Sequence, residues 1–161
     1  MTAGPFVEAD EIGKLDDAYC TLSTCSLQWR AFLASLAIEL HLGSESEEVR
    51  TFLRAVGSRL ASRLPLPKVE TLEELETAMN RVWLEVNWGW VRLGADDEGI
   101  WIVHGSYPTV MVEDDPDLWS LGCSAVLEGV YSHWLTAQGS PGVKTRRVSR
   151  RARPLEFRHG V

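Results

Sequence analysis

Apolar residues recur at helical spacing, three to four residues apart, in four separate stretches of the chain. The first stretch begins at Ser26, the second ends before Pro65, the third follows Thr71, and the fourth covers about residues 118–137. This period predicts four main helices, each with an apolar face. The apolar positions are, in chain order, Trp29, Phe32, Leu33, Leu36 and Leu40; Val49, Phe52, Leu53, Val56, Leu60 and Leu64; Leu72, Leu75, Met79, Val82, Trp83 and Val86; and Trp119, Cys123, Val126, Leu127, Val130, Tyr131 and Trp134.

The pattern becomes strand-like between the third and fourth helices. Residues 88–93 and 100–104 are rich in β-branched and aromatic side chains, and a polar turn that contains Gly99 separates them. We expect the two to pair as a hairpin, followed by short strands at residues 143–148 and 154–158. The fold class is therefore α+β, with four main helices packed against a small antiparallel sheet.

A single domain is expected over residues 26–161, because a chain of 161 residues can bury a hydrophobic core unaided. Residues 1–25 show no sustained period and are predicted to form a mobile arm. Three cysteines form no disulfide framework, and the closest pair, Cys20 and Cys25, is not spaced like a zinc knuckle. No apolar run approaches the ~20 residues that span a membrane, and no basic segment opens a secretory signal, so a cytoplasmic protein is predicted.

Turn and cap residues set the expected limits of the helices. Gly43 is suited to end the first helix, and Thr71 to Glu74 has the pattern of a capping box at the start of the third. Ser44 to Glu47 has the same pattern before the second. Gly57 lies in the middle of the second helix, where it costs up to ~1 kcal/mol relative to alanine, so we expect another helix or a subunit to approach it closely.

Two tryptophans flank a glycine where the helical period gives way to the strand period. Trp88, Trp90 and Arg92 are expected on one face of the strand, with Val91 and Leu93 on the other. The two indoles either fill the core or form a flat platform for a ligand.

Charge is unevenly distributed along the chain. Residues 1–139 hold 22 acidic and 9 basic side chains, for −13, and residues 140–161 hold 1 acidic and 7 basic, for +6, which together give the net −7. A basic tail on an acidic body suits contact between subunits or with an anionic surface. The acidic body argues against a nucleic-acid partner, which would require a broad positive surface. The arginines of the second helix are expected on its outer face, either solvated or at an interface: Arg50, Arg54, Arg59 and Arg63.

Motifs for catalysis are missing from the sequence. It has no glycine-rich phosphate loop, no His-Glu-x-x-His, no Gly-x-Ser-x-Gly and no Cys-x-x-Cys. Glu128 and His133 lie about 140° apart around a helix, so they do not form an acid–base pair. His104, at the end of a predicted strand, is expected to be a hydrogen-bonded structural residue. We therefore predict neither an enzyme, nor a metal site, nor a cofactor.

Several motifs together resemble the family of bacterial cellulose synthase D subunits over residues 28–161. They include Phe32-Leu33-x-x-Leu36, Arg63 to Pro67, Trp88 to Val91 and Ile102 to His104. The most specific block is Leu127-Glu128-Gly129-Val130-Tyr131-x-x-Trp134, which follows the Trp-Gly strand.

This resemblance implies a non-catalytic accessory subunit of bacterial cellulose synthase. It implies a ring-like homo-octamer, a tetramer of dimers, whose passageways guide nascent β-1,4-glucan chains, and other synthase subunits as partners. It leaves a periplasmic location as the alternative to the cytoplasm. On this basis Trp29, Trp88 and Trp90 are the candidate glucan-binding residues, unless they seal cores. Candidates for the oligomer interface are Gly57, Arg147, Arg150 and Arg151.

Two other functions fit the same pattern less well. A vinyl-reductase-like regulatory module, with an apolar pocket for a small molecule, has a similar Trp-Gly strand and Leu-Glu-Gly helix. An enzyme whose site is assembled from distant residues is the second alternative. An octamer of 18.0 kDa chains would fit only the scaffold.

Overall fold

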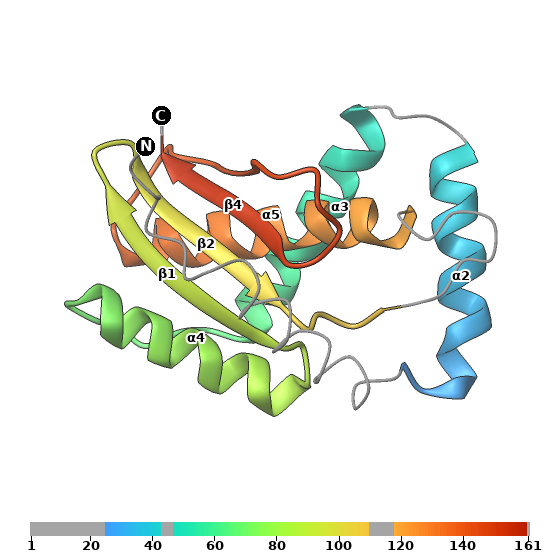
Figure 1. Ribbon diagram of the computed structural model, residues 1–161, viewed down its shortest axis with the longest axis horizontal. Coiled ribbons are helices and arrows are strands. Elements are labelled where there is room, and N and C mark those ends of the chain that lie inside the picture. Colours follow the sequence, from blue (N-terminus) through green and yellow to red (C-terminus); the bar gives the residue numbers. More distant parts are fainter. Residues whose placement is uncertain (1–24, 43–46, 110–117, 161) are drawn as a thin grey trace.

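The computed structural model describes residues 25–42, 47–109 and 118–160 of the chain (Figure 1). The predicted arm therefore lies outside the described residues, apart from Cys25, as do Gly43 and the predicted cap that starts at Ser44. The described elements are α2 (Leu27–Leu42), α3 (Glu47–Arg63), α4 (Leu72–Val86), β1 (Trp90–Asp96), β2 (Gly99–Gly105), α5 (Leu118–Gln138), β3 (Thr145–Arg147) and β4 (Leu155–Gly160). The four predicted helices and the α+β class are confirmed.

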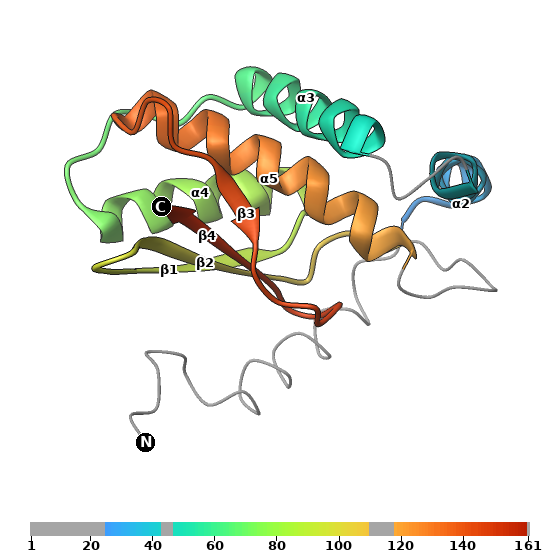
Figure 2. The same ribbon diagram turned by 90° about the horizontal axis from the view of Figure 1, so that it is seen from above.

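The four strands form one antiparallel sheet in the order β1-β2-β4-β3. The predicted hairpin of β1 and β2 is confirmed, with Trp90 opposite Gly105 and Asp96 opposite Gly99. Helices α4 and α5 lie on one side of the sheet, and α3 packs on the far side of α5 (Figure 2). Alternate residues of β4 are buried toward these helices, as the strand period requires.

The junction between α4 and β1 differs from the prediction. Asn87 has a left-handed backbone (φ 56°) that ends α4, and Gly89 has φ 91° and a Cα that lies against the backbone of Gly105. A side chain at Gly89 would be both strained and 2.0 Å from a carbonyl oxygen. The strand therefore starts at Trp90, and Trp88 is part of the turn, so the prediction that Trp88 shares a strand face with Trp90 is wrong.

The predicted capping box at the start of α4 is confirmed. Thr71 accepts a hydrogen bond from the backbone N–H of Glu74, whose side chain accepts one from the backbone N–H of Thr71. The two bonds satisfy N–H groups that have no partner within the helix.

Helices α3 and α5 cross at two glycines. A Cβ at Gly57 would lie 1.9 Å from the carbonyl oxygen of Val126, and a Cβ at Gly129 would lie 2.0 Å from that of Arg54. The backbones therefore touch where both helices lack a side chain. This contact is the close helix approach expected at Gly57, and it lies within one chain. An interface role for Gly57 stays a prediction.

Helix α2 stands at the edge of the molecule, beside the first turn of α5 (Figures 1 and 2). Its buried contact is small: Ala37, with Ala34 beside it, packs against Leu118 and Trp119 of α5. Two residues of the predicted apolar stripe are more than half exposed, Trp29 at 53% and Phe32 at 57%. The sequence pattern located the helix correctly, but it did not show that these side chains stay exposed.

Candidate functional site

Two of the candidate glucan-binding tryptophans lie on different elements. Trp29 is on α2, with its ring edge-to-face against Phe32 at 6.1 Å between centroids. Trp90 is in β1, where its Nε1–H donates to the hydroxyl of Ser106 at 3.2 Å and its indole lies over the Cα of Gly105. The structure does not bring them into one platform.

The third candidate, Trp88, belongs to an aromatic cluster in the core. Its ring stacks on that of Trp83 with 5.7 Å between centroids and 14° between planes. Trp83 is fully buried and also contacts His104, Tyr131 and Trp134. Trp88 therefore helps to seal the core, which is the alternative that the sequence left open.

His104 connects this cluster by two hydrogen bonds. Its Nε2–H donates to the carbonyl oxygen of Trp88 at 2.6 Å, because a carbonyl only accepts, and its Nδ1 therefore accepts from the hydroxyl of Tyr131 at 2.5 Å. Both partners suit the neutral imidazole. The predicted structural role of His104 is confirmed.

Acid is expected to destabilise the fold through His104. Burial lowers the pKa of His104 from 6.5 to about 4, against the opposing effect of the bond to Trp88. Between these two pH values the unfolded chain binds more protons than the folded chain. The free energy of unfolding therefore falls as the pH falls, by about 3 kcal/mol at the lower end of the range. Urea denaturation across this pH range measures the change, and His104→Gln should make the free energy of unfolding depend less on pH. An equal slope in the variant would contradict this assignment.

Glu128 is the centre of an ion network that joins three elements. Its carboxylate is 1% exposed and lies on α5. Arg54 Nε donates to Oε2 at 2.8 Å, and Arg50 donates to Oε1 at 3.1 Å, so two turns of α3 are held to α5. Arg54 also pairs with the exposed Glu47 at 2.6 Å, and this bond lowers the pKa of Glu47. Arg50 and Arg54, which were expected on the outer face of this helix, therefore bind Glu128 within the chain, while Arg59 and Arg63 are exposed.

The same helix also caps the edge of the sheet. β3 is an edge strand, and the N–H groups of Thr145 and Arg147 point away from β4 toward α5. They donate to Ser132 Oγ and Glu128 Oε1, both at 2.8 Å. Glu128 and Ser132 are four residues apart, so their side chains are neighbours on the surface of α5. The distance between them nearly matches the distance between alternate residues of a strand, such as Thr145 and Arg147. An edge that would otherwise be open to another strand is satisfied within the chain.

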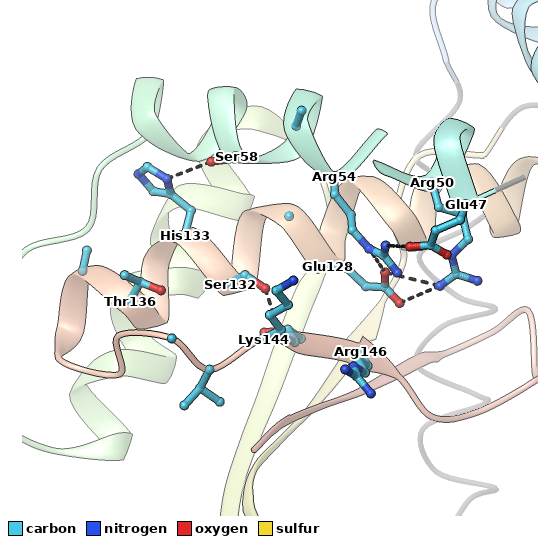
Figure 3. A pocket seen from close by; sticks show the side chains of 16 residues that line it. Glu47, Arg50, Arg54, Ser58, Glu128, Ser132, His133, Thr136, Lys144 and Arg146 are labelled. Atoms are coloured by element: carbon cyan, nitrogen blue, oxygen red, sulfur yellow. Dashed lines mark hydrogen bonds and ion pairs between the residues drawn. The ribbon is translucent and has the colours of Figure 1, made fainter. Parts of the chain in front are cut away.

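A surface groove of about 910 Å³ lies beside this network, between α3, α5 and β3 (Figure 3). Glu128 and its two arginines are at one end. At the other end the hydroxyl of Ser58 and Nδ1 of His133 are 3.0 Å apart. Polar side chains dominate the lining, which includes Ser132, Thr136, Lys144 and Arg146. Glu128 and His133 have separate partners, as expected from their positions around the helix.

The three arginines predicted to form an oligomer interface follow the groove in sequence. Arg147 turns back into its own chain, where Nε donates to the carbonyl of Ser149 and a terminal nitrogen donates to that of Arg151, both at 2.7 Å. Arg150 and Arg151 are exposed. Arg147 thus organises the loop between β3 and β4, and the structure leaves Arg150 and Arg151 available for a contact.

Large apolar side chains of three helices, α2, α3 and α5, are exposed. Within the described residues they include Trp29, Phe32, Leu36 and Ile38 on α2, Phe52 and Val56 on α3, and Leu121 in the first turn of α5. We call this set the apolar end surface. Helix α2 has only two charged residues, Arg30 and Glu39, and is apolar on several sides. A helix with that composition is normally buried, so this surface is suited to protein contact.

Within the described residues, no group of three metal-ligating side chains gathers and no helix is long and apolar enough to cross a membrane. Cys123 is buried, and burial raises the pKa of its thiol to about 12. A thiol of this kind is a poor nucleophile.

Comparison with known proteins gives the family. The sequence matches the family of cellulose synthase D subunits over residues 16–160. The chain belongs to this family. A cellulose synthase operon protein D of Komagataeibacter xylinus is 34% identical over 110 residues, which cover 66% of this chain and 69% of the relative. The protein of the same name from Komagataeibacter sucrofermentans is 33% identical over the same shares. The predicted resemblance is confirmed, and the chain has a role in cellulose synthesis.

The residues of the Leu127 to Trp134 block, on which the resemblance was based, have structural roles. Glu128 holds three elements together, Gly129 allows α3 to touch α5, and Tyr131 binds His104. Trp134 donates its Nε1–H to the carbonyl of Leu64 at 2.9 Å, just before the prolines that end the α3 region. Sequence reasoning gave Glu128 no role. One signal in the sequence could have indicated a buried role for Glu128: it is an acid that lies between apolar residues on the most apolar predicted helix.

Proposed function

We propose that this member of the family is a non-catalytic scaffold that self-associates and organises cellulose synthase complexes. The observation that carries the proposal is the apolar end surface, where Phe32 and Phe52 are each 57% exposed. Leaving such side chains in water is unfavourable, and covering them with a second copy recovers roughly 25 cal/mol per Å² of apolar area. We propose other subunits of cellulose synthase as its partners, because the family is named as a subunit of that enzyme.

The assembly that we propose is the homo-octamer implied by the resemblance, a ring-like tetramer of dimers that guides nascent glucan chains. Self-association through one apolar surface gives dimers, and a second, different surface is needed to join dimers into a ring. The exposed side chains of Arg150 and Arg151, set against the acidic body of a neighbouring copy, are our candidate for that second contact. The cytoplasmic location stays a prediction.

The mass in solution tests the scaffold. Light scattering of the purified protein is expected to give several times 18.0 kDa, with eight chains in the complete assembly. Replacing Phe32 and Leu36 together with glutamine should lower the mass at least about twofold, because it places polar groups in the apolar contact. High salt should leave this contact intact and weaken one that depends on Arg150 and Arg151.

A matched control is available on α4. Leu84 is 71% exposed and lies outside the apolar end surface, so Leu84→Gln should leave the mass unchanged. A wild-type protein that is monomeric at 18.0 kDa, or a Phe32/Leu36 variant that keeps the full mass, would refute self-association through this surface.

Trp29 is the best placed of the candidate glucan-binding residues, because half of its surface is exposed. Trp29→Ala should weaken binding of cello-oligosaccharides if its ring stacks on sugars, and should affect only the mass if it belongs to the contact alone. Trp88→Ala is unsuitable for this experiment, because loss of the stack on Trp83 would destabilise the core.

The small-molecule module is favoured less by the structure. It needs an internal apolar pocket, whereas the rings of Trp83, Tyr131 and Trp134 fill the described core in mutual contact. The groove of Figure 3 is open to solvent and has several charged side chains along it, so it is not an enclosed internal pocket.

A further inference from the structure

None of the residues that line the groove between α3, α5 and β3 belongs to the apolar end surface. It follows α3 from Glu47 to Ser58, a distance of about 16 Å at 1.5 Å per residue. Its shape is therefore an elongated channel on the surface. An extended peptide of about five residues would match this length.

Most of the charge at one end of the groove is already paired. Arg54 binds Glu128 and Glu47, and Arg50 binds Glu128 while its side chain stays 46% exposed. These ion pairs hold α3 and β3 in place, so the walls of the groove are preorganised around them.

Two cations at the β3 side of the groove have no such partner. Lys144 and Arg146 are exposed, and neither forms an ion pair with a carboxylate of the described residues. Arg146 lies opposite Arg158 in the sheet, and Arg158 is already paired with Asp96 and Glu98. The residue opposite Arg146 across this strand pair is therefore a cation, which does not neutralise it.

The spacing of these cations indicates the kind of ligand. Lys144 directly precedes β3, and Arg146 is its middle residue, so the two cations flank the buried Thr145. Residues two apart in an extended segment have Cα atoms about 6.8 Å apart. Carboxylates two residues apart on an extended peptide have the same spacing. The remainder of the channel offers Ser58, His133 and Thr136, whose polar atoms suit the polar groups of a peptide.

We propose that this groove binds an extended acidic segment of a protein partner, with carboxylates two residues apart pairing with Lys144 and Arg146. The proposal rests on the scaffold role, since it gives the scaffold a docking site for a partner that is separate from the surface joining its own copies. Charge complementarity selects an acidic partner, although the protein as a whole is acidic, because the unpaired charge of the groove is positive.

Fluorescence anisotropy tests the groove directly. The probe is a labelled peptide of about ten residues with alternating glutamate and serine, titrated with the full-length protein at low salt. We expect saturable binding that weakens as salt is added. The double substitution Lys144→Gln and Arg146→Gln should weaken it about tenfold, the effect of losing two partly exposed ion pairs.

The matched control removes the same charge outside the groove. Arg59 and Arg63 are exposed on α3 and do not line the groove, so Arg59→Gln with Arg63→Gln should leave the affinity within about twofold. Equal weakening in both double variants would show a general electrostatic attraction and overturn the proposal. Absence of saturable binding, or displacement of the peptide by an equal concentration of inorganic phosphate, would overturn it as well.

Light scattering of the same samples separates this proposal from the scaffold. Both double variants should keep the wild-type mass. A protein that assembles without binding the peptide refutes the groove alone, and a monomer that binds the peptide refutes self-association alone.

Discussion

Replacing Glu128 with glutamine is expected to lower the free energy of unfolding by about 3 kcal/mol. The carboxylate is 1% exposed and accepts hydrogen bonds from Arg50, Arg54 and the backbone N–H of Arg147, so it joins α3 and β3 to α5. Glutamine keeps the shape but turns one acceptor into a donor that faces other donors, and it removes the charge. The side chains of Arg50 and Arg54 are 46% and 32% exposed, so water compensates part of the lost interaction. The expected loss of stability is therefore at the lower end of the range for breaking a buried ion pair.

Urea denaturation at a single protein concentration measures this change, because the proposed assembly would make the apparent stability depend on concentration. Glu47→Gln is the matched control. It removes a carboxylate that binds the same Arg54 but is 74% exposed, so no measurable loss is expected. If both variants had the same stability, Glu128 would not be the centre of the network.

Replacing Gly129 with alanine is expected to cost about 3 kcal/mol through a different mechanism. The added Cβ would lie 2.0 Å from the carbonyl oxygen of Arg54 and 2.8 Å from its carbon, and these are backbone atoms that a rotamer change cannot move. Helix α3 must therefore shift away from α5, which also loosens the contact at Gly57 and the bonds from Arg50 to Glu128. Urea denaturation detects the loss, and near-ultraviolet circular dichroism reports the shift of the packed aromatic rings.

The same helix contains a control for this substitution. Gly122 on α5 has only Leu53 Cδ1 near its Cβ position, at 3.9 Å, so an alanine fits. Gly122→Ala should stabilise the protein by about 0.5–1 kcal/mol, because alanine loses less conformational entropy in a helix. A loss at Gly122 as large as that at Gly129 would show that close contact with α3 is not the cause.

The helices and strands of this protein could be predicted because their signals are local. The third helix has a period of apolar residues from Leu72 to Val86, and the cap at Thr71 marks its start, so its limits agree with α4. The hairpin followed from two β-branched runs around a polar turn. The strand start was misplaced by two residues, because the left-handed cap at Asn87 and the turn at Gly89 depend on how α4 meets the sheet.

The candidate site was less accessible to sequence reasoning. Trp88 and Trp90 are two residues apart, yet one stacks in the core and the other lies over the outer face of Gly105.

Deleting residues 144–161, a direct test of the basic tail, would remove β4 with its fully buried Leu155 and Phe157. Point substitutions at Arg150 and Arg151 are needed instead.

The sequence by itself determined the element order, the α+β class and, through its motifs, the family. Each of these depends on residues close together in the chain, where spacing and propensity are sufficient. Only the tertiary structure decided that Glu128 joins Arg50, Arg54 and β3, because these groups are far apart in the sequence. Glu128 is 74 to 78 residues from the two arginines and 19 residues from Arg147. It also decided that α2 leaves its large apolar side chains exposed. Periodicity shows that a helix has an apolar face, and only packing shows whether that face is covered by its own chain.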